Sequence, residues 1–532
     1  MALQQRVVLL AFDALDPETV RAQAAAGRLP TFRAVLETSA SCTVRNPIGL
    51  FVGSLWSSFF TALTPVRTGF HCWEEIVGGT YTWRLTTADI AGTPFWETLS
   101  EQGKRVAILD VPHTRAGTPV NGVQLSEWGC HDRHFGLRSF PAEWSEEIID
   151  DVGIHPILSV DPFAEREWAP DDYVHRAAAH RTLDEERMLR DGLTTGVERK
   201  LRLSTGVLTR EPWDLFISVF GESHAVGHQL WHLHDRRHPR FDAARRATVG
   251  DPVDDVYGRL DQALADHLAL IDDDTTLLVL LSHGMGAHND GTHLLPEMLR
   301  RLDAAYKKTL HRSRRGRGLS RIWSGLPASL RHAFSPALAW VVRRALRFRP
   351  QGDARDGETE DERRHQAFFL SPNNFVIGGV RLNMAGRESE GIVQPGQPAA
   401  DVCRRLEADF LGMVNVATGT PVVRRVERSD AHYDRASLDA LPDLFLEWNQ
   451  DHPIETVWSP RVGVIHGRYQ HWRTGDHRPD GLLLARGPGI SQATAPSSID
   501  IIDLAPSIAA RLGVCLDDID GRPAAWLASA TP

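Results

Sequence analysis

Two histidines spaced four residues apart are the clearest chemical signal in this chain. His224 and His228 lie in Gly221–Asp235, a segment with an unusual density of histidine. Residues four apart share one face of a helix, so both imidazoles can bind the same metal ion. The spacing therefore predicts a metal site on a helix. His232 and His234 belong to the same segment and are left without a role.

Other candidate ligands follow apolar runs that are typical of buried strands. Asp13 comes directly after Val7–Phe12, and His283 closely follows Leu277–Leu281 beside two glycines. The histidine pair itself follows a third such run, 215–220. An aspartate in this position is equally often a helix cap or a turn residue, and a lone histidine is more often structural. Because these clusters all follow strands, we expect them to converge on one metal centre.

The segment Thr474–Leu484 supplies a further candidate. His477 lies among Gly, Asp and Pro residues that favour a tight turn, and the apolar run of an expected strand follows. A turn at the edge of a sheet holds a ligand rigidly. We therefore expect His477 to complete the site from the far end of the chain.

A hydroxyl near an expected helix start provides the candidate nucleophile. Within Phe51–Leu63, Gly53 and Ser54 are expected to open a helix that begins near Trp56. Backbone N–H groups and the positive end of the helix dipole favour a bound phosphate there. Ser54 is thus predicted as both nucleophile and metal ligand. A plain N-cap serine is the structural alternative.

Apolar strands alternating with helical segments indicate an α/β fold with a doubly wound, mostly parallel sheet flanked by helices. Expected strands also include Val106–Val111. The expected helices are Pro94–Gly103, Asp172–Arg190, Leu260–Ile271 and a closing helix, Ile499–Leu512. In such sheets ligands bind beyond the carboxyl ends of the strands, where the polar clusters lie.

An Arg-rich region divides the expected core. We predict an α/β core formed by residues 1–300 and 366–532, with 301–365 as an inserted helical cap. The insertion contains an amphipathic stretch, Leu330–Phe348, and a following acidic run. Its arginines either pair with these acids on a solvated helix or contact an anionic membrane surface.

Composition narrows the class of protein. The 532 residues are 42% hydrophobic and 24% charged, with a formal net charge of -10, so the chain is globular and no nucleic-acid partner is expected. The five cysteines form no CxxC pair, which argues against a thiolate zinc site or a disulfide framework. The N-terminus has no signal-peptide pattern and no apolar run is long enough to span a bilayer, so a cytoplasmic location is expected.

Taken together, these residues resemble the alkaline phosphatase superfamily, in particular its type I phosphodiesterase/nucleotide pyrophosphatase branch. The resemblance covers most of the chain outside the Arg-rich insertion. It is carried by Val8–Asp13, Trp56–Thr61 with Pro65 and His71, Phe95-Trp96, Gly103–Val106, Gly227-His228 with Trp231, Ser282–Gly286, Arg381–Asn383 with Gly386-Arg387, Pro442–Leu444 and Thr474–Gly481.

The resemblance implies two divalent metal ions, usually zinc, that hold a small phosphorylated substrate. By motif, Asp13, Ser54 and His283 would hold one ion, and His224, His228 and His477 the other. A hydroxyl would then attack phosphorus and form a covalent phospho-enzyme.

Three positions depart from the family pattern. Ser282 and His224 stand where the family has aspartates. The register of the nucleophile is open, because counting back from Trp56 reaches Val52 rather than Ser54. Because two carboxylate ligands of the family are missing, the site could bind either one metal ion or two, and the metal could be zinc or manganese. Glu222, Asp290 and Ser282 are the candidate compensating ligands.

Three functions remain open. The first is a metal-dependent hydrolase of phosphodiesters or phosphoanhydrides. The second is a catalytically degenerate protein that binds a phosphorylated ligand, and the third is a phosphotransferase or mutase acting on lipid headgroups. A sulfatase is disfavoured, since Leu63 occupies the position of the required Cys or Ser in Leu63-Thr64-Pro65-Val66-Arg67.

Overall fold

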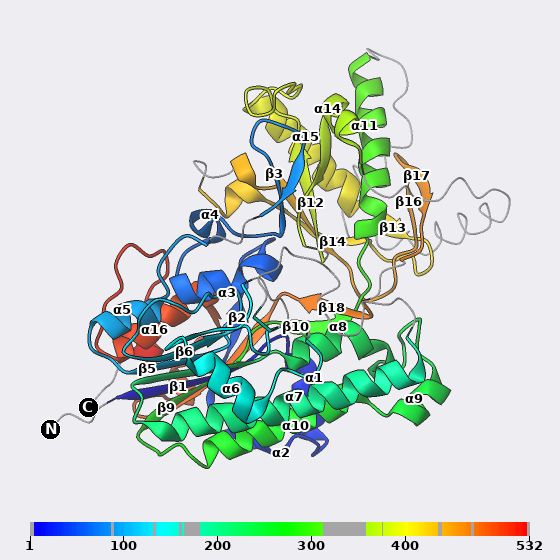
Figure 1. Cartoon of the computed structure of the whole chain (residues 1–532). Helices are drawn as coiled ribbons and strands as arrows, with labels where there is room; N and C mark the ends of the chain where they lie inside the picture. Colours follow the sequence, from blue (N-terminus) through cyan, green and yellow to red (C-terminus); the bar gives the residue numbers. More distant parts are fainter. Residues whose placement is uncertain are drawn as a thin grey trace.

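The computed structural model of the chain describes residues 5–86, 90–130, 135–158, 162–163, 181–311, 358–374, 376–434, 439–469 and 473–528. A nine-stranded sheet forms its lower half (Figure 1). The strand order is β20 (Ser498–Asp500), β2 (Ala40–Arg45), β19 (Gly481–Arg486), β9 (Thr275–Leu281), β1 (Arg6–Phe12), β8 (Leu215–Phe220), β5 (Val106–Leu109), β6 (Gly122–Ser126) and β7 (Arg138–Phe140).

The centre of this sheet is parallel. β1 pairs in parallel with β8 and β9, and β5 pairs in parallel with β8 and β6. At the edges, β19 pairs antiparallel with β9, and β7 pairs antiparallel with β6. All seven residues of β9 are buried, as expected for a strand covered on both faces. The predicted mostly parallel α/β sheet is confirmed, and the carboxyl ends of β1, β8 and β9 meet at one edge.

Helices cover both faces of the sheet. One face packs against α1 (Pro17–Ala25), α2 (Pro30–Thr38), α6 (Trp144–Val152), α7 (Leu183–Arg210), α8 (Glu222–His234), α9 (Ala243–Val249) and α10 (Pro252–Leu268). The other packs against α3 (Phe51–Thr61), α5 (Phe95–Glu101), α16 (Leu504–Arg511) and α17 (Ala525–Ala528). Successive residues of β1 face opposite clusters, because side chains alternate along a strand.

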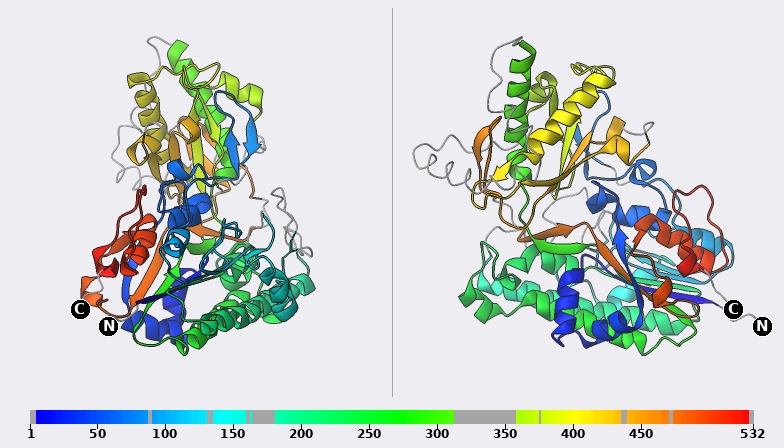
Figure 2. Two further views of the ribbon diagram at one scale, coloured as in Figure 1. Left: turned by 60° about the vertical axis from the view of Figure 1, so that its left-hand side comes forward. Right: turned by 180° about the vertical axis from the view of Figure 1, so that it is seen from behind.

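A smaller unit lies above the carboxyl edge of the large sheet (Figures 1 and 2). It contains an antiparallel sheet in the order β11 (Phe368–Ser371), β12 (Ile377–Leu382), β15 (Leu444–Trp448) and β14 (Val423–Arg428). A second, three-stranded sheet consists of β13 (Val414–Asn415), β16 (Thr456–Ser459) and β17 (Gly463–His466). Both sheets pack with α11 (Leu295–His311) and α15 (Gln397–Leu411) around a separate hydrophobic cluster.

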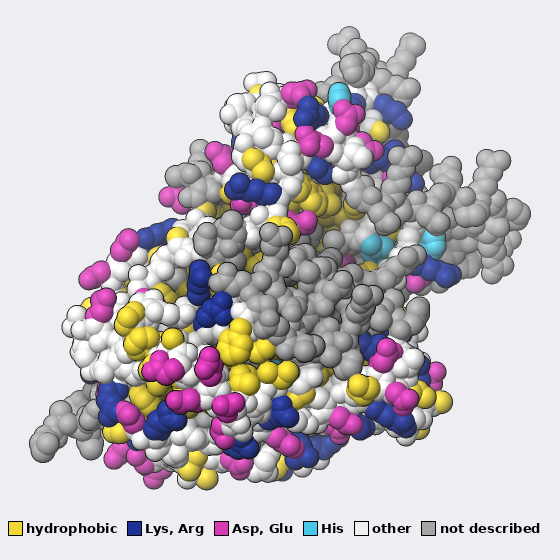
Figure 3. Space-filling view, viewed as in Figure 1, with side chains coloured by type: hydrophobic (Ala, Val, Ile, Leu, Met, Phe, Trp, Pro, Cys, Tyr) yellow, Lys and Arg dark blue, Asp and Glu magenta, His cyan; other side chains and the backbone are white. Residues whose placement is uncertain are grey.

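Short elements complete the two units. They are α4 (Pro65–Thr68), α14 (Glu360–His365), and the hairpin of β3 (Glu74–Ile76) and β4 (Trp83–Leu85). A two-stranded antiparallel ribbon, β10 (Gly284–Ala287) with β18 (Gly475–Arg478), lies at the junction. Acidic and basic side chains are interspersed over the described part of the face in Figure 3. Among the described residues, no helix combines the length and apolarity needed to cross a bilayer.

Several element boundaries differ from the sequence prediction. The closing helix begins at Leu504 rather than Ile499, because residues 498–500 pair as an edge strand with β2. The segment 366–466, assigned from sequence to the α/β core, contains the strands of the separate small sheets. The predicted cap begins inside α11, and its residues 312–357, with the amphipathic stretch, lie outside the described residues. Part of the expected helix 172–190 lies outside them too, and α7 begins at Leu183.

Candidate metal centre and active site

Asp13 is held at the end of β1 by neighbours from three other segments. Its backbone N–H donates to the carbonyl of Phe220, so the strand pairing extends to the site. The indole N–H of Trp56 and the hydroxyl of Ser282 both donate to Asp13 Oδ1, at 3.0 and 2.9 Å. Ala14 has a φ of 53°, which turns the chain away immediately afterwards. The carboxylate is therefore buried and fixed in orientation.

The prediction that His224 and His228 lie on one helix is confirmed. His224 and His228 lie on α8, which begins one residue after β8 ends. The Nε2 atoms of the two rings are 2.9 Å apart, and His224 Nδ1 lies 2.6 Å from Asp13 Oδ2. His228 is fully buried, and His224 is 9% exposed. Helix periodicity and the strand end thus bring the two rings and the carboxylate together.

The hydrogen bonds of these rings define which nitrogens can bind a metal. His228 Nδ1 lies 2.8 Å from the carbonyl oxygen of Gly475, and His283 Nδ1 lies 3.0 Å from that of Gly284. A carbonyl oxygen only accepts, so in each neutral ring Nδ1 carries the proton and Nε2 presents a lone pair. In the same way Asp13 holds the proton of His224 on Nδ1. A hydrogen bond from the ring nitrogen that does not face the metal is typical of metal-ligating histidines.

His477 reaches the centre from β18. The sequence prediction of a tight turn at this residue was wrong, because its segment pairs with β10 and the turn follows at Pro479-Asp480. Its ring centroid lies 4.6 Å from that of His228 and 4.8 Å from that of His224. His477 Nδ1 is buried without a hydrogen-bond partner among the described residues. A buried, unsatisfied imidazole nitrogen fits a metal ligand.

Two overlapping groups of side chains could therefore hold a cation. One consists of His224, His228 and His477, and the other of Asp13, His224 and His283; within each, the potential ligand atoms lie within 4.8 Å of one another. The first group has the three residues predicted from sequence for one ion; the second keeps Asp13 and His283 of the other predicted set but contains His224 instead of Ser54. Asp13 of the second group already accepts hydrogen bonds from Trp56, Ser282 and His224.

Charge in the centre is tightly balanced. Burial alone would raise the pKa of Asp13, but attraction to His224 and His283 and the hydrogen bonds from His224 and Ser282 lower it below its ordinary value. Burial, together with the neighbouring His283 and His224, lowers the pKa of His477 well below its ordinary value. A neutral imidazole beside an ionised carboxylate is the state that a metal ion requires.

The structure places Ser54 differently from the prediction. α3 begins at Phe51, with Leu50 as N-cap, instead of near Trp56. Ser54 is consequently the fourth residue of the helix, fully buried, and its hydroxyl donates to the carbonyl of Leu50 at 2.8 Å. The expected helix start was wrong because the turn signal lies earlier, at Pro47 to Gly49. The role of Ser54 as nucleophile and ligand stays a prediction.

The proposed compensating ligands have distinct positions. Glu222 Oε1 lies 3.3 Å from His155 Nε2, outside both groups. Ser282 hydrogen-bonds Asp13. Asp290 lies instead in a separate cluster with His288 and Asp476. Sequence analysis missed Asp476, although an Asp directly beside His477 is a usable signal.

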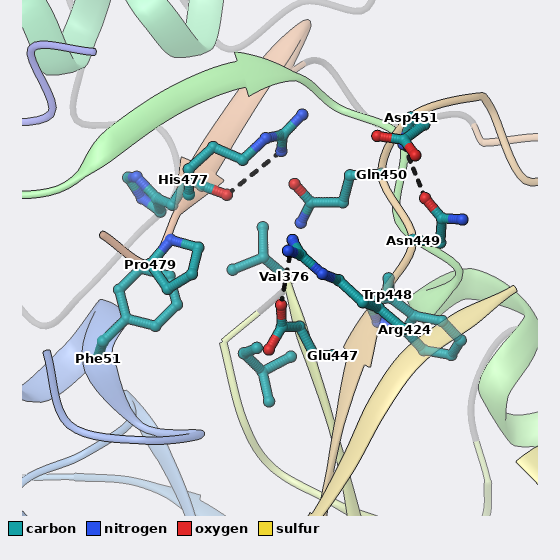
Figure 4. A pocket seen from close by; sticks show the side chains of 12 residues that line it. Phe51, Val376, Arg424, Glu447, Trp448, Asn449, Gln450, Asp451, His477 and Pro479 are labelled. Carbon is teal, nitrogen blue, oxygen red and sulfur yellow. Dashed lines mark hydrogen bonds and ion pairs between the residues drawn. The ribbon is translucent and has the colours of Figure 1, made fainter. Parts of the chain in front are cut away.

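A cavity of about 290 Å³ adjoins His477 at the junction of the two units (Figure 4). The core contributes Phe51, His477 and Pro479, and the small sheet contributes Arg424 and Glu447 among others. The Phe51 ring also contacts His283 and His477, with centroids 6.0 and 6.5 Å apart. The first residue of α3 therefore borders both the histidine centre and the cavity.

A family comparison now assigns the chain. Residues 7–477 match the model of the type I phosphodiesterase / nucleotide pyrophosphatase family. The chain belongs to this family. The match includes both candidate ligand groups and confirms the resemblance to the alkaline phosphatase superfamily. A search of curated protein sequences returned no match.

Solved structures are similar to this chain over most of its length. Phosphonoacetate hydrolase from Sinorhizobium meliloti, in complex with phosphonoacetate, is similar at 12% identity with a TM-score of 0.50, and 94% of each chain is covered. Wild-type alkaline phosphatase PafA has 12% identity, a TM-score of 0.47, and coverage of 99% of this chain and 100% of its own. Human ectonucleotide pyrophosphatase / phosphodiesterase 5 has 12% identity, a TM-score of 0.43, and coverage of 97% of both chains.

Proposed function

We propose that this protein is a metal-dependent phosphohydrolase acting on phosphodiester or phosphoanhydride bonds, with its principal cation at His224, His228 and His477. The observation that carries the proposal is the 2.9 Å separation of the Nε2 atoms of His224 and His228. With both Nδ1 atoms protonated, two lone pairs face each other. A proton or a cation between them removes this repulsion.

The donor set suits zinc. Three neutral imidazoles with an open fourth position are typical of catalytic zinc sites. Asp13 then acts on His224 rather than on the cation, by fixing its tautomer and ring orientation. When bound, the ion would supply Lewis acidity toward a phosphoryl oxygen and lower the pKa of a water molecule. His283 and Asp13 are the residues that would hold a second ion, as the sequence predicts.

The N-terminus of α3 gives the site a place for an anion. No side chain caps this helix, whose first residue, Phe51, contacts His283 and His477. The first N–H groups of a helix lack intrahelical partners and attract phosphate oxygens. A phosphoryl group between this helix end and the histidines is thus neutralised from two sides.

The position of Ser54 favours water as the nucleophile. An attacking hydroxyl must reach phosphorus, but that of Ser54 is buried and donates to Leu50 within its own helix. His224, His283 and Ser282 lower the pKa of Asp13 against the effect of burial, so the ionised carboxylate stays available to hold the proton of His224 on Nδ1. The alternative is the predicted serine nucleophile, reached by rotation of the Ser54 side chain.

The adjoining cavity favours a small phosphorylated substrate with a polar remainder. Arg424 and Arg478 line it together with Glu447 and Asp451, and Trp448 adds an aromatic face. Such a lining fits a substituent with hydrogen-bonding groups better than an aliphatic chain. The Arg-rich insertion and its contact with an anionic membrane surface, like the cytoplasmic location, stay predictions.

Turnover of bis-p-nitrophenyl phosphate tests the proposal, with p-nitrophenyl sulfate as the control substrate. We expect nitrophenol release from the phosphodiester that a chelator stops and zinc or manganese restores. Release that survives exhaustive chelation contradicts metal dependence. Metal binding without release of nitrophenol from this or any other phosphoester would favour the second reading, a catalytically degenerate protein that binds a phosphorylated ligand.

A further inference from the structure

A second acidic and imidazole cluster lies beside the histidine centre and is not used by it. It consists of His288 and Asp290, which follow β10, and Asp476, which lies on β18. All three side chains are 1% exposed. His288 Nε2 lies 2.5 Å from Asp290 Oδ2, and His288 Nδ1 lies 2.9 Å from Asp476 Oδ2.

The β10–β18 ladder fixes this arrangement. Gly286 pairs with Asp476, and the N–H of His288 donates to the carbonyl of Thr474 at 3.0 Å. The ribbon therefore sets the carboxylate and the imidazole opposite each other before any ligand arrives. Preorganised side chains on a rigid element are what a specific ion site needs.

Each carboxylate uses one oxygen for the backbone and directs the other into the cluster. Asp290 Oδ1 accepts the N–H of Thr292 at 2.8 Å, and Asp476 Oδ1 accepts the N–H of His477 at 2.9 Å. The two Oδ2 atoms are buried, and both face the same imidazole, that of His288, at 2.5 and 2.9 Å. Two buried carboxylates that share one imidazole are costly unless a cation, or a proton on that imidazole, balances their charge.

Among the described residues, Arg473 and His288 supply positive charge near the two acids. Arg473 Nη1 lies 3.6 Å from Asp476, on the Oδ1 side. His288 contacts both Oδ2 atoms but can contribute at most one positive charge. Two buried carboxylates around one imidazole therefore carry an excess of negative charge that a divalent ion can neutralise.

We propose that His288, Asp290 and Asp476 form a separate divalent-cation site. Two carboxylates and one imidazole suit manganese or zinc, and the larger share of oxygen ligands makes this site harder than the three-histidine group. Asp476 Oδ1 lies 3.8 Å from His477 Nε2, so the two sites are neighbours joined by adjacent residues of β18. This position differs from the Asp13 and His283 group that the family resemblance implies.

Anomalous diffraction from crystals soaked in manganese chloride tests the site directly. We expect a manganese peak bounded by His288, Asp290 and Asp476. Peaks confined to the histidine centre, or no peak at all, would overturn the proposal and leave a proton on His288 as the balancing charge. A peak at this cluster in a protein without phosphodiesterase activity would support the site and reject the proposed function.

Metal content in solution provides the second measurement. Asp290→Asn should lose one equivalent of manganese and keep zinc at the histidine centre, whereas His228→Ala should lose the zinc. Glu186→Gln is the matched control, because this buried carboxylate already pairs with His232 and Arg245, at 3.1 and 2.9 Å. Equal manganese content in wild type and Asp290→Asn would contradict the proposal. If the variant does not fold, the anomalous diffraction of manganese-soaked wild-type crystals tests the site instead.

Discussion

Replacing Ser54 with alanine separates the two candidate nucleophiles. The Ser54 hydroxyl makes one buried hydrogen bond, to the Leu50 carbonyl, worth about 0.5–1.5 kcal/mol. That carbonyl keeps a second donor, the Ser54 N–H at 3.2 Å, so no acceptor is orphaned. Alanine also gains about 0.5 kcal/mol of helix propensity. We therefore expect stability to change by less than about 1 kcal/mol.

The matched control is Ser57→Ala on the same helix. The Ser57 hydroxyl is also fully buried and donates to a backbone carbonyl, that of Ser54, at 3.0 Å. With water as nucleophile, both variants should keep kcat/KM for bis-p-nitrophenyl phosphate within about fivefold of wild type, the factor that corresponds to about 1 kcal/mol. Loss of a serine nucleophile costs on the order of 10⁶-fold. A loss beyond about a thousandfold in Ser54→Ala alone refutes the reasoning.

Three further variants test other parts of the account. Lys200→Met should lower the free energy of unfolding in urea titrations by about 3–5 kcal/mol. The Lys200 Nζ atom lies 2.7 Å from Asp110, and both side chains are 1% exposed, so the substitution leaves a buried carboxylate without its cationic partner. An unchanged midpoint of urea unfolding would contradict this prediction. Burial lowers the pKa of His71 from 6.5 to about 4, so only the unfolded chain takes up a proton between these values and stability falls as the pH drops below 6.5. His71→Gln should not show this loss of stability, which amounts to about 1.4 kcal/mol per pH unit in the wild type. Parallel plots of the free energy of unfolding against pH for variant and wild type would contradict the prediction. Zinc at a concentration of a hundred times its Kd should stabilise the wild-type protein by about 2.7 kcal/mol. His477→Ala should abolish this stabilisation in thermal unfolding. Stabilisation of the variant by zinc would mean that zinc binds elsewhere.

Much of the site could be predicted because its ligands follow strongly apolar strands. Asp13 and His283 follow strands in which all residues but Arg6 are buried, and such apolar runs are visible in the sequence. The spacing of His224 and His228 has meaning only on a helix, and the helix follows β8 directly. In parallel α/β sheets these ends share one edge, so convergence follows from topology.

The sequence predictions were wrong or incomplete mainly where contacts between distant segments determine the local structure. β18 has only four residues and exists because it pairs with β10, so Gly, Asp and Pro gave His477 the pattern of a turn. The start of α3 was misplaced because the turn at Pro47 to Gly49 was overlooked; Leu50 and Phe51, which follow this turn, lie in one hydrophobic cluster with Phe445 of the small sheet. Asp476 and His288 are nearly 190 positions apart in the chain, and only the ribbon reveals that they touch.

A zinc titration of metal-stripped protein, followed by hydrolysis of bis-p-nitrophenyl phosphate, tests the central claim most directly. The account predicts no turnover without metal and a rise that saturates at a stoichiometric equivalent of zinc. The same titration of His228→Ala should stay flat. Full activity in the stripped wild type, or equal activation of the variant, would contradict a catalytic cation at His224, His228 and His477.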